Sequence, residues 1–125
     1  MPAKRILVCD DDPAILRVLE VNLEFEGYHV LTAGHGEKAI ELARHERPDL
    51  VILDIMMPRL DGYETCRRLK AAEETRHIPV LFLTARAPIG EAFSDDQDLA
   101  EGYLTKPFDP AELLEVVGRL VGGEG

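Results

Sequence analysis

Five polar residues that could take part in chemistry stand at the ends of short, largely apolar runs in this sequence. They are three aspartates, a threonine and a lysine: Asp10, Asp11, Asp54, Thr84 and Lys106. Three carboxylates in one crevice repel one another strongly, so they need a metal cation or a nearby ammonium group to balance them. The set therefore predicts a site for a cation, provided that folding brings these residues together.

The runs that precede the aspartates and the threonine are typical of strands buried on both faces of a sheet. They are short and apolar at consecutive positions: Arg5–Cys9, Leu50–Leu53 and Val80–Leu83. In open α/β sheets the ligand lies beyond the carboxyl ends of the strands, where the strand order reverses. We therefore expect the three aspartates to meet in one crevice.

Helix signals alternate with the strand signals along the chain. Asp12 and Pro13 mark a helix start that Gly27 ends, and Asp109 with Pro110 repeats this start near the end of the sequence. Asp12 is fully explained as a helix cap. The expected strands cover residues 5–9, 28–33, 50–54, 79–83 and 103–105, and the expected helices cover residues 13–26, 36–46, 63–74 and 110–121, with a short or loosely packed helix between 88 and 100.

This alternation predicts the α/β class, with a single-domain flavodoxin-like (βα)5 fold. The five-stranded parallel sheet would have the order 2-1-3-4-5, with right-handed crossovers and helices on both faces. A chain of 125 residues suits one domain, which we assign to residues 1–121. Residues 122–125 are glycine-rich and are expected to form a flexible tail or a linker stub.

Composition narrows the range of partners. The net charge of −10 argues against direct nucleic-acid binding by this chain, because its field repels phosphates. No apolar stretch approaches the roughly 20 residues that span a bilayer, and no secretory leader is apparent. Cys9 and Cys66 follow buried-strand and helix patterns, which predicts unpaired thiols in a reducing cytoplasm. We therefore expect a cytoplasmic location.

The oxygen-rich set favours magnesium as the cation. Mg²⁺ prefers oxygen ligands and is commonly held by one or two carboxylates, whereas zinc sites use the histidine and cysteine side chains that this set lacks. A carboxylate that faces a phosphoryl donor can act as a nucleophile and form an aspartyl phosphate. Asp54 is the candidate nucleophile, and Lys106 and Thr84 would meet the charge of the acyl phosphate.

Taken together, these residues resemble the receiver domain of bacterial two-component response regulators over residues 4–121. The matching motifs are Ile6-Leu7-Val8-Cys9-Asp10-Asp11, Leu53-Asp54 with Met57-Pro58 and Asp61-Gly62, Leu83-Thr84-Ala85, and Tyr103-Leu104-Thr105-Lys106-Pro107-Phe108. The separations agree with the family, since Thr84 and Lys106 lie 84 − 54 = 30 and 106 − 54 = 52 positions after Asp54. The motifs are highly specific in combination.

The resemblance implies a role for each residue of the site. Asp54 would accept a phosphoryl group. Asp11, Asp54 and the backbone carbonyl of Met56 would bind Mg²⁺, with Mn²⁺ as a substitute, and Asp10 would act largely through a bound water. Lys106 would bind the phosphoryl oxygen, with the Lys106–Pro107 bond in the cis form. Thr84 and Tyr103 would act as the switch pair, although Tyr103 also has a packing-only interpretation.

Two neighbouring positions are expected to set the phosphoryl lifetime. In this family the residues two beyond the phosphorylated aspartate and two beyond the threonine tend to govern water access, and here they are Met56 and Arg86. A bulky methionine and a long arginine would shield the acyl phosphate, so we expect slow self-dephosphorylation.

The expected partners follow from the same resemblance. A sensor histidine kinase or a phosphotransfer protein would donate the phosphoryl group. A downstream effector domain or protein would contact the face formed by the helix at 88–100, the strand at 103–105 and the last helix, and a homodimer could form through this face on phosphorylation. The chain would be a signalling switch rather than an enzyme, with phosphotransfer to itself and autophosphatase activity.

Two other functions are compatible with parts of this pattern. A magnesium-dependent phosphatase with an aspartyl nucleophile places a second aspartate two residues later, where this chain has Met56. A phosphate-independent, receiver-like interaction module remains as the alternative. The intact set of aspartates, threonine and lysine argues against that alternative, whereas the weakly apolar stretch between residues 88 and 100 favours it.

Overall fold

The computed structural model describes residues 3–85 and 100–122, which form a sheet covered on both faces. The strands are β1 (Arg5–Cys9), β2 (His29–Ala33), β3 (Leu50–Asp54), β4 (Val80–Thr84) and β5 (Gly102–Thr105). The helices are α1 (Pro13–Phe25), α2 (Gly36–Glu46), α3 (Gly62–Ala71) and α4 (Pro110–Gly122). The short helix expected between residues 88 and 100 lies almost entirely outside the described residues.

All neighbouring strands are parallel, and their order is β2-β1-β3-β4-β5. The predicted flavodoxin-like fold and strand order are thereby confirmed. The order reverses between β1 and β3, because the chain leaves β1 for β2 on one side and later builds β3, β4 and β5 on the other. The carboxyl ends of β1 and β3 therefore lie next to each other.

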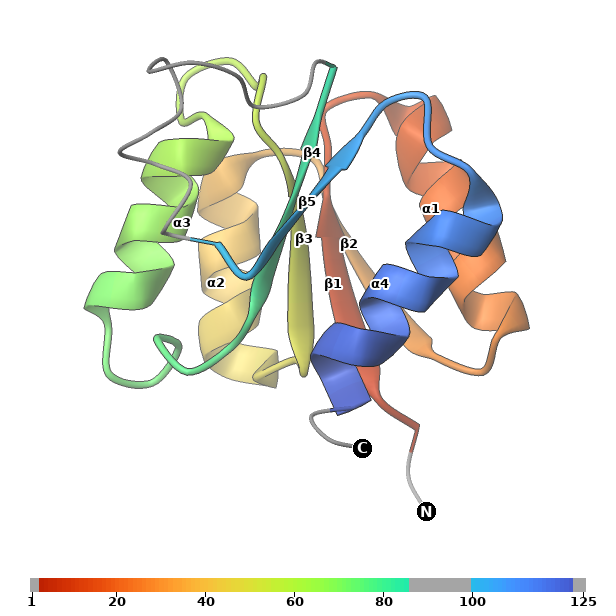
Figure 1. Cartoon of the computed structure of the whole chain (residues 1–125). Coiled ribbons are helices and arrows are strands. Elements are labelled where there is room, and N and C mark those ends of the chain that lie inside the picture. The colour runs from red at the N-terminus through yellow and green to blue at the C-terminus, as the bar shows by residue number, and fades with distance from the viewer. Residues whose placement is uncertain (1–2, 86–99, 123–125) are drawn as a thin grey trace.

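The core has two halves, one on each face of the sheet. In Figure 1, α2 and α3 cover one face and α1 and α4 cover the other. Leu53 and Phe82 belong to the half under α2 and α3, whereas Ile52 and Leu83 belong to the half under α1 and α4. Consecutive residues of β3 and β4 are thus buried on opposite faces, as expected for central strands of a parallel sheet.

The helix starts follow the sequence signals. The Asp12 side chain accepts a hydrogen bond from Ala14 N at 2.9 Å, and the Asp109 side chain accepts one from Ala111 N at 3.0 Å. Asp61 caps α3 in the same way, by accepting from Glu64 N at 2.9 Å. Gly27 follows α1 with φ +104°, a conformation that favours glycine.

Candidate functional site

Asp10 and Asp54 lie at the carboxyl ends of the adjacent strands β1 and β3. Asp10 is fully buried and Asp54 is 4% exposed, whereas Asp11 is exposed. Asp10 and Asp54 are buried because β1 and β3 are the two strands on either side of the reversal of strand order. The carboxyl ends of these strands form the crevice. The structure confirms that the three aspartates predicted to converge do so, since carboxylate oxygens of all three lie within 4.8 Å of one another.

Lys106 brings a positive charge to this carboxylate cluster from the end of β5. Its Nζ donates to Asp10 Oδ2 at 2.9 Å and lies 3.3 Å from Asp54 Oδ1. The backbone helps to place it, because Lys106 N donates to Thr84 O at 2.7 Å. The Lys106–Pro107 peptide bond is cis, as predicted. Lys106 therefore bridges the two buried carboxylates rather than pairing with Asp54 alone.

Backbone N–H groups hold the two buried carboxylates in place. Asp12 N donates to Asp10 Oδ1 at 2.9 Å, so Asp10 accepts one bond on each carboxylate oxygen. Met56 N donates to Asp54 Oδ1 at 3.3 Å. Hydrogen bonds of this kind favour the charged form of a carboxylate and fix its orientation.

The charges in this cluster are not fully balanced. Burial raises the pKa of Asp54, the negative charge of Asp10 raises it further, and Lys106 and the Met56 N–H only partly oppose this shift. Burial would by itself lower the pKa of Lys106, but its hydrogen bond to Asp10 and the charges of Asp10 and Asp54 outweigh it, so that pKa is raised. The arrangement thus holds more negative charge than one lysine neutralises.

The neighbouring thiol of Cys9 is inert for the same reasons. Burial and the nearby charges of Asp10, Asp54 and Asp11 raise the pKa of Cys9 to about 12. Since the thiolate is the reactive form of cysteine, this thiol takes no part in nucleophilic chemistry at neutral pH. Both cysteines are buried and neither forms a disulfide bond, as the sequence predicted.

The loop after Asp54 packs closely on the strand end. Gly62 N donates to Ile55 O at 3.0 Å, and a Cβ atom at Gly62 would stand 2.5 Å from Asp54 O and 2.8 Å from Ile55 Cα. Both of these neighbours are backbone atoms, which cannot move aside cheaply. The first residue of α3 is therefore glycine because it rests against the peptide group of Asp54.

The donor set suits a hard divalent cation. Mg²⁺ takes oxygen ligands, and the side chains of the three aspartates offer only oxygens. Hydrogen bonds from backbone N–H groups hold two of these side chains, those of Asp10 and Asp54, in fixed orientations. The surplus negative charge at Asp10 and Asp54 gives a cation an electrostatic reason to bind. The residues therefore fit a magnesium site formed by Asp10, Asp11 and Asp54.

The structure describes three of the four remaining predicted residues. Thr84 ends β4 and is 3% exposed, and Tyr103 lies on β5 with its ring 5.5 Å from the ring of Phe82. Met56 directly follows the strand end and is 67% exposed. Arg86 lies outside the described residues. The switch and lifetime roles of these residues stay predictions.

Sequence reasoning did not foresee two contacts. Asp10 is the closer partner of Lys106, and Cys9 Sγ lies 3.6 Å from Met57 Sδ beneath the loop. For the first contact the sequence indicates only that Asp10, which directly follows the apolar run, is buried where its neighbour Asp11 is exposed. The second contact depends on how the loop folds back, for which we find no signal.

A flavodoxin-like fold with three acidic side chains and a lysine at the carboxyl edge is typical of phosphoacceptor domains. The chain belongs to the response regulator receiver domain family, whose model matches residues 6–118.

Curated relatives of the chain include transcriptional regulators. The chain is 46% identical over 117 residues to the DNA-binding dual master transcriptional regulator RpaA of Synechocystis, covering 94% of this chain and 48% of that protein. It is 44% identical to the alkaline phosphatase synthesis transcriptional regulatory protein PhoP of Bacillus subtilis, covering 88% of this chain and 45% of that protein. The chain thus spans about half the length of these relatives.

Solved structures of receiver domains superpose closely on the fold. The chemotaxis protein CheY4 of Vibrio cholerae matches with a TM-score of 0.89 at 30% identity, covering 95% of this chain and 99% of that one. The receiver domain of a sensor histidine kinase from Pseudomonas aeruginosa matches with a TM-score of 0.87 at 33% identity, covering 97% and 99%. That second structure has a magnesium ion coordinated in its active site cleft.

Among the described residues, no helix has both the length and the apolar character that crossing a membrane would require.

Proposed function

We propose that this chain accepts a phosphoryl group on Asp54 in a Mg²⁺-dependent reaction and acts as a signalling switch. The observation that carries the proposal is the position of Asp54: buried, beside Asp10 and Asp11, with Lys106 Nζ 3.3 Å from its Oδ1. The family and the magnesium-bound relative support the same function. Self-transfer and self-hydrolysis would be the chemistry of the switch rather than turnover of an external substrate.

The residues divide the reaction between them. A carboxylate oxygen of Asp54 attacks the phosphorus of the donor, a new P–O bond forms, and the bond from phosphorus to the donor breaks with its electron pair. Lys106 meets a phosphoryl oxygen, with Thr84 at the end of the neighbouring strand. Asp10, Asp11, Asp54 and the Met56 carbonyl would hold Mg²⁺ or Mn²⁺, which would neutralise charge on the transferring group. An apolar Met56 at the rim favours slow self-dephosphorylation.

A phosphoryl group on Asp54 would change the balance of charge at Lys106. Lys106 directly follows β5, and Tyr103 lies on that strand, so a new partner for Lys106 would act on the edge of the sheet. We infer that Thr84 and Tyr103 respond and alter the face formed by β5, α4 and the segment before β5. A downstream effector domain or protein, or a second copy of the chain, would bind this face.

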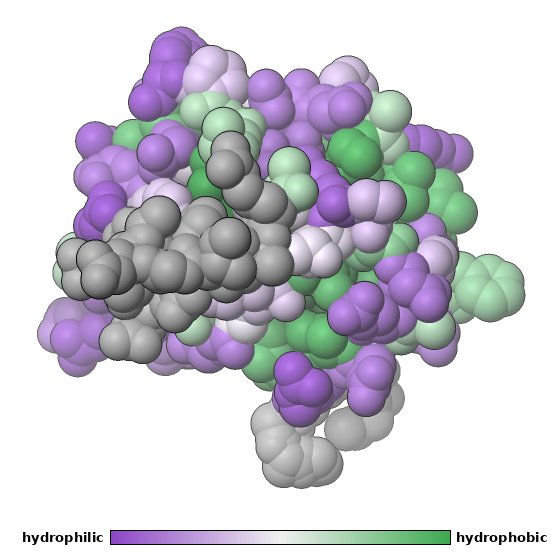
Figure 2. Space-filling model, turned by 45° about the horizontal axis from the view of Figure 1, so that its top comes forward, coloured by the Kyte–Doolittle hydropathy of each residue, from purple (hydrophilic) through white to green (hydrophobic). Residues whose placement is uncertain are grey.

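An apolar stripe on α1 supports a protein as the natural phosphoryl donor. Val18 is 44% exposed, Val21 is 48% exposed and Phe25 is 89% exposed, and their spacing places them on one side of the helix. In Figure 2, which tilts the carboxyl edge toward the viewer, apolar residues reach the surface on the side of α1. Since α1 begins directly after the aspartates, a helical domain of a histidine kinase or phosphotransfer protein could lie along the stripe and present its phosphohistidine to Asp54.

The decisive experiment is the intact mass of the protein after incubation with Mg²⁺ and a small acyl phosphate. We expect a single phosphoryl adduct that is absent from Asp54→Asn and from wild type in chelator. The absence of an adduct under all conditions would favour the alternative, a phosphate-independent interaction module.

A second experiment tests the donor surface. Phe25→Ser should slow transfer from a phosphorylated histidine kinase by about tenfold, corresponding to ~1.4 kcal/mol, while the reaction with the small donor keeps its rate. Glu24→Ser is the matched control, because Glu24 is also exposed on α1 but lies outside the stripe. Equal slowing with both donors would show that the stripe is not a docking surface.

A further inference from the structure

The sulfur atoms around the phosphorylation site differ sharply in their exposure. Met56 is 67% exposed, whereas Met57 is 7% exposed and Cys9 and Cys66 are fully buried. Met57 and Cys9 also contact each other, with Sγ and Sδ 3.6 Å apart. Among these four side chains, an oxidant in solution can therefore reach only that of Met56 without opening the core.

Met56 is also tied directly to the proposed phosphoacceptor. Its backbone N–H donates to Asp54 Oδ1 at 3.3 Å. Its side chain helps to line a cavity of about 410 Å³ together with Ile55, Met57, Asp61 and Tyr63. A change in the polarity of this side chain therefore occurs on a residue whose backbone contacts the Asp54 carboxylate, at the mouth of an adjoining cavity.

We propose that Met56 is an oxidation site and that its sulfoxide shortens the lifetime of the phosphorylated chain. The proposal rests on the proposed phosphorylation of Asp54 and adds a regulator of the same site, namely a peroxide. With hydrogen peroxide, the thioether sulfur attacks one oxygen, an S–O bond forms and the O–O bond breaks with its electron pair on the other oxygen, which takes the proton of the transferred oxygen and leaves as water. The sulfur is oxidised by two electrons and the peroxide is reduced.

The expected direction follows from the chemistry of the product. A methionine side chain is apolar, whereas its sulfoxide is polar and accepts hydrogen bonds. A sulfoxide oxygen at position 56 would bind water close to the acyl phosphate, and it would not be stabilised by contact with the apolar Ile55 side chain. Hydrolysis should become faster, and methionine sulfoxide reductases should reverse the effect because they regenerate the thioether.

The oxidation itself is tested on unphosphorylated protein that has not been incubated with a phosphoryl donor. Wild type is treated with graded hydrogen peroxide, and fragment ions that separate residues 56 and 57 locate the added oxygen. We expect Met56 to be oxidised before Met57 in wild type and at the same peroxide dose in Met57→Leu, and no oxidation at position 56 in Met56→Leu. Oxidation of Met57 before Met56, or resistance of Met56 in the folded protein, would overturn the proposal.

The regulatory effect is tested by the decay of the phosphoryl adduct after the donor is removed. Each variant is compared with its own untreated sample, so any effect of the substitution on the starting lifetime cancels. We expect peroxide to shorten the lifetime roughly tenfold in wild type and Met57→Leu but not in Met56→Leu, with recovery after reductase treatment. An unchanged lifetime after complete oxidation of Met56 would overturn the proposal.

The two experiments separate this inference from the proposed function. If untreated protein never forms an adduct, the proposed function fails and the regulatory effect fails with it, while selective oxidation of Met56 is decided by the peptide analysis alone. If the adduct forms normally and oxidation of Met56 leaves its lifetime unchanged, only the present inference fails.

Discussion

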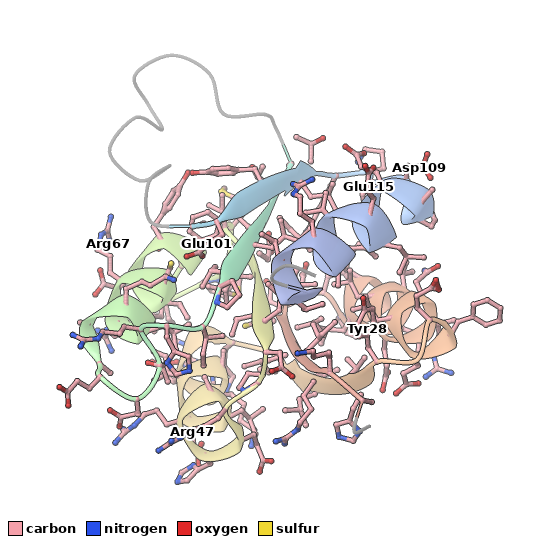
Figure 3. The ribbon with its side chains drawn as sticks, turned by 60° about the horizontal axis from the view of Figure 1, so that its bottom comes forward. Tyr28, Arg47, Arg67, Glu101, Asp109 and Glu115 are labelled. Atoms are coloured by element: carbon pink, nitrogen blue, oxygen red, sulfur yellow. The ribbon has the colours of Figure 1, made fainter. Side chains whose placement is uncertain are left out.

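At the carboxyl edge of the sheet one lysine faces two buried aspartates, whereas at the opposite edge Arg5 and Lys70 each meet a half-exposed glutamate. Lys70 Nζ donates to Glu101 Oε2 at 3.0 Å, and Arg5 pairs with Glu46. Figure 3, which brings the lower edge forward, shows Glu101 beside α3. The first edge holds surplus negative charge away from solvent, and the second holds paired charges near solvent.

This difference separates a functional use of charge from a structural one. Glu101 Oε1 accepts a hydrogen bond from Val80 N at 2.7 Å, so its carboxylate joins the starts of β4 and β5 to α3. A paired, solvated carboxylate of this kind can bind little else. Asp10 and Asp54, by contrast, share one cation and leave room for another, which is the condition for binding a metal ion.

The largest expected effect comes from removing the lysine at the carboxyl edge. Lys106→Met should lower the free energy of unfolding in chelator by about 3 kcal/mol, because two buried carboxylates lose their common partner. Arg5→Met at the opposite edge should cost less than about 1 kcal/mol, since its partner is half-exposed. Urea unfolding measures both values, and equal losses would remove the distinction between the two edges. Added Mg²⁺ should restore part of the loss in Lys106→Met only.

An opposite effect is expected from removing a carboxylate at the same edge. Asp54→Asn should raise the free energy of unfolding in chelator at pH 7 by on the order of 1 kcal/mol, because it removes a buried charge that Lys106 does not fully balance. Thermal unfolding with and without chelator measures the change. A destabilised Asn variant would show instead that the charges at this edge are already matched.

The same variant should show a defined dependence on pH. The pKa of Asp54 is raised by folding, so the folded protein keeps this proton to higher pH than the unfolded chain does. The stability that this group contributes is present below its ordinary pKa of about 3.9 and is lost as the pH rises through the raised value. The advantage of Asp54→Asn should therefore grow across that interval and vanish in more acidic solution.

The smallest effect is expected at Glu101. Glu101→Gln keeps an oxygen that can accept from Val80 N but loses the charge that pairs with Lys70, so it should cost roughly 0.5 kcal/mol. The yield of the phosphoryl adduct should not change. A loss of adduct in this variant, measured by intact mass, would mean that the two edges are coupled through β5.

The sequence supported the prediction of the fold because local and global signals agree. The buried strands, the Asp-Pro helix starts and the reversal of strand order together specify where Asp10 and Asp54 lie before any side-chain contact is known. The partner of Lys106 could not be predicted in the same way, because it depends on which of two nearby carboxylates the side chain reaches. The contact between Lys70 and Glu101, 31 positions apart, likewise requires the packed structure.

Gly62 shows how a residue without chemistry can be as constrained as one that reacts. Its Cα rests so close to the backbone of Asp54 and Ile55 that even the smallest side chain would force α3 away from the strand end. Substituting a neighbouring side chain could not relieve this clash, because both neighbours are backbone atoms. In a scan of all single substitutions scored by phosphorylation, position 62 should therefore tolerate as few residues as position 54, although only position 54 forms a bond to phosphorus.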